Sequence, residues 1–203
     1  METFSIALLV SIFMFSFATS MTPGPNNIML LSSGLTFGYK RTIPHILGVV
    51  LGFPLMTICV GLGLGRLFDL YPMVFMVLKV VGILYLLWLA WKIAHSKPTF
   101  KANDNDAKPL TFFPIILFQW VNPKNWMKII TAMSVYVTSV DEAMTQIIII
   151  SIIFLLTVSI SANTWALGGA VLKKFIKSDI GIKRFNVIMA ILLVLSIIPT
   201  LFE

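Results

Sequence analysis

Two short stretches of the chain combine side-chain amides and a lysine with proline, and their chemistry suits the binding of a small charged solute. Proline lacks a backbone donor and glycine favours non-helical dihedrals, so each stretch interrupts a helix and frees backbone N–H and C=O groups. Free N–H groups at a helix N-terminus attract an anion such as a carboxylate. The candidate binding residues are Thr22, Pro23, Gly24, Pro25, Asn26 and Asn27 in the first stretch, and Gln119, Asn122, Pro123, Lys124 and Asn125 in the second.

Both ends of a zwitterion would find partners in this set. Half-helices that begin at Asn26 and Asn27 and at the second stretch direct positive dipole ends at a carboxylate, and Lys124 adds a positive charge. The carbonyl ends of the preceding half-helices, around Ser20 and Trp120, would accept from an ammonium group, and Trp120 or Trp126 would add a cation–π contact. The simpler alternative is that the amides only cap the broken helices.

The polar stretches interrupt two apolar segments, at residues 4–35 and 110–138. The first has 32 residues, and as one helix it would reach about 48 Å, against about 30 Å for the hydrocarbon core. This length and the breaks predict discontinuous transmembrane helices, with a plain proline kink as the alternative. Both breaks read Pro-x-Asn-x-Met, and Pro25 and Pro123 lie 98 residues apart, close to half the chain. This spacing predicts an internal repeat.

The composition is that of an integral membrane protein, with 58% hydrophobic and 11% charged residues. The net charge of +7 comes from basic residues between apolar spans, which indicates retention on the cytoplasmic side and not nucleic-acid binding. One cysteine, Cys59, and two histidines, His45 and His95, do not provide a metal site, so we expect no metal and no cofactor. Residues 1–20 lack a basic start, and we interpret them as mature protein.

The predicted fold class is an all-α membrane protein with six transmembrane helices. The loops after the first, third and fifth spans hold eleven Lys and Arg, and the opposite side holds only Arg66, which places both termini in the periplasm. Three spans per half then give two inverted three-helix repeats, at residues 1–95 and 110–203, joined by a cytoplasmic loop at 96–109. Unwound crossings and re-entrant hairpins both fit the first and fourth spans. The spans are expected at residues 4–35, 43–64, 72–93, 110–138, 145–171 and 185–202.

No Asp or Glu lies inside a predicted span. A substrate such as lysine would bring a second positive charge with no carboxylate to meet it, so we expect a small neutral amino acid. Proton coupling usually uses intramembrane Asp, Glu or His, and the coupling candidates left here are Lys124 at the break and Lys79 in the third span. Snorkelling to the interface is the simpler role for Lys79.

Two further features of the spans have structural and functional alternatives. Asn163 is a polar residue in the middle of the fifth span, where it would either line a cavity or bond to another helix. Gly48 and Gly52 form a GxxxG motif, which serves packing inside the chain or, as the alternative, a homodimer. We favour internal packing.

At these residues the chain resembles the LysE/RhtB family of amino-acid exporters. The family's hallmarks are Thr-Pro-Gly-Pro-Asn in the first span, Gly-x-x-Tyr-Leu in the third and Asn-Pro-Lys in the fourth. They are matched here by residues 22–26, 82–86 and 122–124. Residues 21–27, 88–94 and 165–167 are most similar to the cysteine/O-acetylserine exporter subgroup. The resemblance implies efflux across a bacterial inner membrane by proton antiport.

The sequence therefore predicts a secondary exporter of small neutral amino acids, such as cysteine, O-acetylserine, threonine, homoserine or leucine, whose partners are its substrate and the lipid bilayer. Alternatives are export of basic amino acids or of another small solute such as a metal cation. A membrane scaffold would not require polar breaks in both halves. A membrane-embedded enzyme would need a metal cluster or a nucleophile–base pair, so we predict neither enzymatic activity nor catalytic residues.

Overall fold

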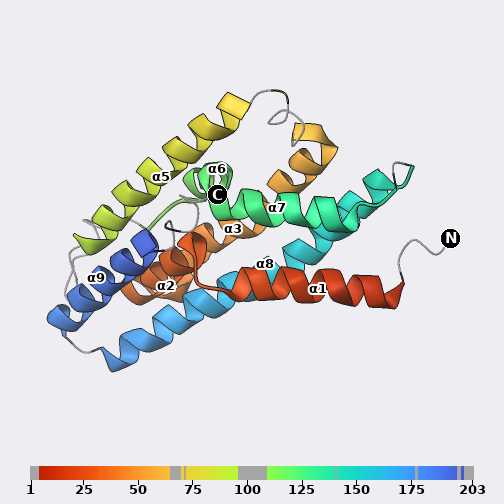
Figure 1. Ribbon diagram of the computed structural model, residues 1–203. Helices are drawn as coiled ribbons and strands as arrows, with labels where there is room; N and C mark the ends of the chain where they lie inside the picture. The colour runs from red at the N-terminus through yellow and green to blue at the C-terminus, as the bar shows by residue number, and fades with distance from the viewer. Residues whose placement is uncertain are drawn as a thin grey trace.

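The computed structural model describes residues 5–64, 70, 72–95, 109–139, 141–176, 178–195 and 198. These residues are almost entirely helical, and they contain no strand. The longest helix, α8, has 33 residues and packs against α1, α2 and α3 (Figure 1). In chain order the elements are α1 (Ile6–Met21), α2 (Pro25–Phe37), α3 (Tyr39–Cys59), the π-helical η1 (Val60–Leu64), α5 (Pro72–Ala94), α6 (Phe112–Val121), α7 (Pro123–Tyr136), α8 (Ala143–Phe175) and α9 (Asp179–Leu195).

Several helices have the length and composition to cross a bilayer. Tyr39–Gly63, with 25 residues, and α8 are each long and apolar enough, and α1 and α2 would together make a third span, bent by 56° at their break. The outward face of α3 is apolar, with Leu47, Leu51 and Leu55 between 45% and 50% exposed. Such a surface is stable in lipid and not in water, so the protein is an integral membrane protein. The six-span inverted repeat remains a prediction.

The structure contains both expected helix breaks. Helix α1 ends at Met21 and α2 begins at Pro25, with the extended Gly24 before it. Helix α6 ends at Val121 and α7 begins at Pro123. Proline is the first residue of the second half-helix at both breaks. Its missing N–H costs little there, because the first N–H groups of a helix have no intrahelical partner.

Two helices begin earlier than the sequence predicted. Helix α3 begins at Tyr39, so the polar residues 40–41 lie in its first turn and not in a loop. Gly38 alone separates α2 from α3, and its φ of 79° suits glycine. Helix α9 begins at Asp179, ahead of the predicted sixth span, because basic residues at a helix end lower the hydropathy without ending the helix. The expected loop at 96–109 lies outside the described residues, except for its last residue.

Helices α2 and α8 pack with their backbones in contact through two glycines. A Cβ atom on Gly34 would lie 2.1 Å from the Ala166 carbonyl oxygen, and one on Gly169 would lie 2.0 Å from the Leu31 carbonyl oxygen. Only hydrogen fits at such distances. Small residues allow this close approach of helices in membranes, and the contacts attach the short half-helix α2 to the long α8.

The GxxxG motif of α3 faces α6 within the same chain. A Cβ atom on Gly48 would lie 2.7 Å from Cβ of Ile115, and one on Gly52 would lie 3.1 Å from Cα of Ile116. Internal packing therefore accounts for this motif. One half-helix of each broken segment is thus held by a helix from the other half of the chain: α2 by α8, and α6 by α3.

Replacing Gly169 by alanine should lower the free energy of unfolding by roughly 1–3 kcal/mol, because the added methyl group overpacks the contact with α2. The measurement is the thermal unfolding of the purified protein in detergent. Gly168→Ala is the matched control, since a Cβ atom there meets only Cδ1 of Leu31 at 3.6 Å and alanine is the better helix former. Equal unfolding temperatures for the two variants would contradict the close backbone contact.

Candidate functional site

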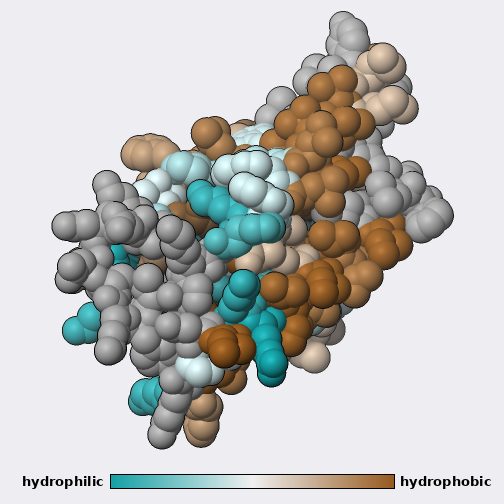
Figure 2. Space-filling view, turned by 90° about the vertical axis from the view of Figure 1, so that its left-hand side faces the viewer, coloured by the Kyte–Doolittle hydropathy of each residue, from teal (hydrophilic) through white to brown (hydrophobic). Residues whose placement is uncertain are grey.

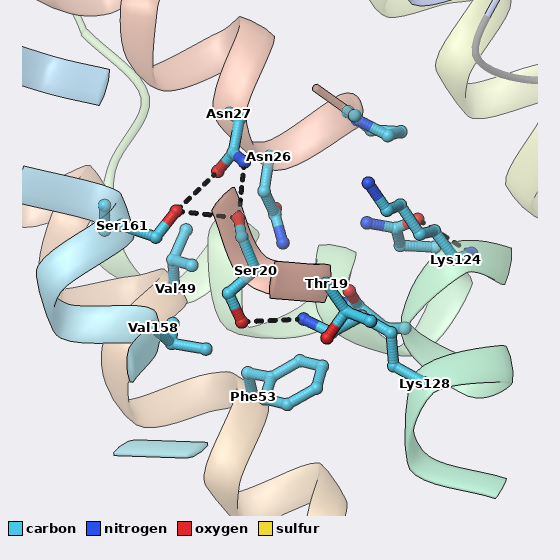
Figure 3. Close-up of a pocket in the computed structure, with 15 residues that line it drawn as sticks. Thr19, Ser20, Asn26, Asn27, Val49, Phe53, Lys124, Lys128, Val158 and Ser161 are labelled. Carbon is cyan, nitrogen blue, oxygen red and sulfur yellow. Dashed lines mark hydrogen bonds between the residues drawn. The ribbon is translucent and has the colours of Figure 1, made fainter. Parts of the chain in front are cut away.

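The two helix breaks lie together around a small cavity (Figure 3). Its volume is about 30 Å³, which has room for one or a few water molecules, since one water needs about 10–15 Å³. The walls come from both broken segments and from α3 and α8. Seven of the twelve predicted binding residues line it, namely Gly24, Pro25, Asn26, Asn27, Asn122, Lys124 and Asn125.

Asn27 satisfies the backbone at the first break. Its Nδ2 donates to the carbonyl oxygens of Ser20, at 2.7 Å, and Thr22, at 2.9 Å, which are the free groups at the end of α1. The Ser161 hydroxyl of α8 lies 2.7 Å from the same Ser20 oxygen and 3.4 Å from Oδ1 of Asn27 (Figure 3). Asn27 therefore caps the end of α1 and not the start of α2, where Gly24 stands without a side-chain cap.

Asn125 has the same role at the second break. Its Nδ2 lies 3.2 Å from the carbonyl oxygen of Gln119 and 2.9 Å from Oε1 of the same residue. The asparagine of each Pro-x-Asn sequence thus reaches back to the half-helix that precedes it. Asn122 is the N-cap of α7, and its side chain accepts from the backbone N–H of Lys124 at 3.2 Å.

The carbonyl groups expected to bind a substrate ammonium are already occupied. The Ser20 oxygen accepts from Asn27, and the Trp120 oxygen accepts from Nε1 of Trp126 at 2.7 Å. Neither tryptophan lines the cavity, where the aromatic ring is that of Phe53. The structure differs from the expectation because a carbonyl that is buried without a donor is unfavourable, and nearby side chains satisfy it.

A pair of side-chain amides joins the two breaks. Asn26 donates through Nδ2 to Oε1 of Gln119 at 2.8 Å, and Nε2 of Gln119 lies 3.3 Å from Oδ1 of Asn26. Gln119 is fully buried and also donates to the Ile115 carbonyl at 2.9 Å. Gln119 therefore stands behind the cavity and holds the lining residue Asn26 in place.

Lys124 reaches from the second break to the first. Its Nζ lies 2.9 Å from Oγ1 of Thr22 and from the Pro23 carbonyl oxygen, and 3.2 Å from the Thr22 carbonyl oxygen. A Cβ atom on Gly24 would lie 2.8 Å from this Nζ, so glycine gives the ammonium room. An ammonium has three protons, and all three have a partner here. Pro123 begins α7 directly before this lysine.

Lys128 is a charged cavity residue that the sequence analysis did not select. Its Nζ donates to Oγ of Ser20 at 3.1 Å and lies 4.4 Å from the ring centroid of Phe53 and 5.4 Å from that of Phe154. A signal for it existed in the sequence. A lysine four positions after Lys124 on one helix faces the same side.

Asn163 does not line the cavity. Asn163 accepts from the Tyr39 hydroxyl and donates to the Ser159 carbonyl at 2.8 Å, so it joins α8 to α3. Lys79 is a residue of α5, and the structure does not describe its side chain. Within the described part of the chain, no group of three or more His, Cys, Asp or Glu side chains is placed to hold a metal ion.

The sequence matches the LysE type translocator family over residues 17–198. A cysteine/O-acetylserine efflux protein of Escherichia coli (strain K12) is 33% identical over 188 residues, which are 92% of this chain and 94% of the relative. Relatives of the same name from Shigella flexneri and Escherichia coli O139:H28 (strain E24377A / ETEC) are 33% and 32% identical over the same shares. No solved structure matches the chain significantly. The family match includes both breaks and every residue of the cavity.

Asn27→Ala should lower the free energy of unfolding by about 1–3 kcal/mol, because it leaves the Thr22 carbonyl at the end of α1 without this donor. Unfolding of the purified protein in mixed micelles measures the change. Asn26→Ala is the matched control and should cost less, since Oε1 of its partner Gln119 keeps the bond from Asn125. A larger loss in Asn26→Ala would contradict the capping role of Asn27.

Proposed function

The chain belongs to the LysE type translocator family, and we propose that it is a secondary exporter of small neutral amino acids, with cysteine and O-acetylserine as the first candidates. The observation that carries the proposal is the cavity where two broken helices meet, lined by amides and two lysines. Paired broken helices around a polar site are the architecture of many secondary transporters. The name of the relatives, cysteine/O-acetylserine efflux protein, supports the substrate class.

The proposed membrane arrangement has six crossings, formed by α1 with α2, α3 with η1, α5, α6 with α7, α8, and α9. Residues 1–95 and 110–203 form the two inverted repeats, and residues 96–109 form the loop between them. The matching roles of Asn27 and Asn125 support this arrangement, because each caps the half-helix before its own break. The same local sequence performs the same physical task in both halves.

The distribution of charge supports one orientation in a bacterial inner membrane. Hydrophilic side chains gather at the end of the molecule where α2 meets α3 and where α8 ends (Figure 2). Lys40 and Arg41 lie in the first turn of α3, and Lys173 and Lys174 lie in the last turn of α8. Basic residues remain preferentially in the cytoplasm. This end therefore faces the cytoplasm, and both termini lie on the periplasmic side.

The lining of the cavity supports a neutral zwitterion as the substrate. No Asp or Glu in the described part of the chain lines it, so the second cation of a basic amino acid would have no counter-charge. The substrate ammonium has two acceptors among the lining residues. The Thr19 hydroxyl gives its proton to the Phe15 carbonyl at 2.8 Å and keeps lone pairs free, and Oδ1 of Asn26 accepts only a long 3.3 Å bond.

The small volume of the cavity supports alternating access. A space of about 30 Å³ holds water and not an amino acid, so the site must widen before a substrate enters it. The contacts that cross between the breaks, from Lys124 to Thr22 and Pro23, are the ones that such a movement would change. In the proposed transport cycle, the protein exchanges the amino acid for protons, so that the proton gradient drives export.

Everted inner-membrane vesicles that contain the protein should take up labelled cysteine or O-acetylserine when a proton gradient is imposed, and a protonophore should abolish the uptake. Threonine, leucine and lysine complete the set of labelled substrates. Vesicles without the protein provide the background. Preferential uptake of lysine would contradict the argument from missing carboxylates, and no uptake of any of the five would overturn the proposed function.

The orientation predicts which single cysteines a membrane-impermeant maleimide can reach. In a Cys59→Ser background, Asp141→Cys should react in intact cells, because the α7–α8 connection faces the periplasm. Lys40→Cys should react only after the membrane is permeabilised. Both positions are exposed in the structure, so burial does not explain a difference between them. The opposite labelling pattern would invert the assigned topology.

A further inference from the structure

Among the residues that the structure describes, two lysines and no acidic side chain line the cavity. These lysines are Lys124 and Lys128. The two lysines lie four residues apart on α7, where like charges repel each other. A charge that is taken out of water without a counter-ion is unfavourable. The cavity is therefore built to receive a negative group.

The two lysines differ in how much of their bonding capacity the protein uses. Nζ of Lys124 has three oxygen partners, all in the first break. Among the described residues, Nζ of Lys128 has one hydrogen-bond partner, the hydroxyl of Ser20. Since an ammonium carries three protons, Lys124 is saturated by the protein, whereas Lys128 keeps donors for another acceptor.

Two aromatic rings hold Lys128 in position. Phe53 and Phe154 pack edge to face with their centroids 5.1 Å apart, and both are almost fully buried. The faces of such rings attract a cation but do not neutralise its charge. They also keep water away from this side of the ammonium. Lys128 is thus oriented toward the end of α1 (Figure 3), and no described Asp or Glu in the cavity pairs with its charge.

We propose that Lys128 is the counter-charge for the carboxylate of the transported amino acid, and that Lys124 is a structural tie between the two breaks. This inference rests on the proposed function and assigns one atom of the site, Nζ of Lys128, to one group of the substrate. The carboxylate accepts from the donors of Lys128 that the protein leaves free. It also neutralises a charge that Ser20 and the two rings leave unpaired.

The first test compares two competitors of labelled O-acetylserine uptake in everted vesicles. L-Cysteine has the free carboxylate, and L-cysteine methyl ester keeps the amino group and the thiol but lacks the negative charge. For the wild-type protein, the ester should compete at least roughly tenfold more weakly, because it cannot form the charge-assisted bond. Equal competition by the two compounds would overturn the proposal without any variant being made.

The second test separates the two lysines. Lys128→Met should raise the KM for O-acetylserine by roughly 10- to 100-fold and should remove the discrimination between cysteine and its methyl ester. Lys124→Met should lower the unfolding temperature and keep the discrimination. Lys128→Arg keeps the charge and should also keep the discrimination. The proposal is wrong if Lys128→Met retains both the wild-type KM and the discrimination, or if only Lys124→Met loses it.

A chemical rescue tests the charge itself. In a Cys59→Ser background, the thiolate of Lys128→Cys attacks 2-aminoethyl methanethiosulfonate, which forms a disulfide that carries an ammonium group and releases methanesulfinate. O-acetylserine uptake should recover after this treatment and not after treatment with methyl methanethiosulfonate, which adds a neutral group. Equal recovery with both reagents would show that volume and not charge matters, which would overturn the proposal.

The outcomes distinguish the inference from the function on which it rests. If wild-type vesicles transport none of the amino acids, the proposed function fails and the role of Lys128 fails with it. If wild-type vesicles transport O-acetylserine and Lys128→Met behaves like the wild type, the exporter remains and only the carboxylate assignment is lost.

Discussion

The structure depends on one constraint, which is that backbone groups freed at a helix break inside a membrane must find partners within the protein. Each break leaves carbonyl oxygens at the end of one half-helix and N–H groups at the start of the next. Asn27 and Asn125 satisfy the carbonyls, and proline occupies the first position of α2 and α7, where no donor is needed. The Pro-x-Asn sequence is therefore a compact solution to a problem that both broken helices share.

The partners of one break also come from the other break, and this couples the two. Lys124 of the second break satisfies the backbone of the first, and Asn26 of the first bonds to Gln119 of the second. A movement at either break changes the hydrogen bonds of both. A polar group that exchanges a hydrogen bond within the protein for one to a substrate loses little free energy. The structural role of these amides and a binding role are therefore compatible.

Local chemistry made the two breaks predictable, and long-range packing made their contacts unpredictable. Proline and asparagine at matched positions favour a helix break, so both breaks and seven of the fifteen residues that line the cavity follow from the sequence. The partner of each side chain does not. Lys128 meets Ser20 at a separation of 108 residues, and the carbonyl of Ser20 is occupied by Asn27 and Ser161. Such pairings depend on how the helices pack, which local spacing does not encode.

The tightest backbone contacts join helices of different halves, and this limits how the cavity can widen. Helix α2 is held to α8 at Gly34 and Gly169, and α3 is held to α6 at Gly48. Helix α5 packs on α9, and Gly82 of α5 admits the Val121 carbonyl at the end of α6. Separating residues 1–95 from 110–203 as two rigid bodies would open all of these contacts. Hydrogen bonds made by side chains around the cavity are easier to exchange than close contacts between two helix backbones. A movement that widens the site at low cost therefore keeps the paired helices together and displaces α1 and α7, whose charged and amide contacts meet at the cavity.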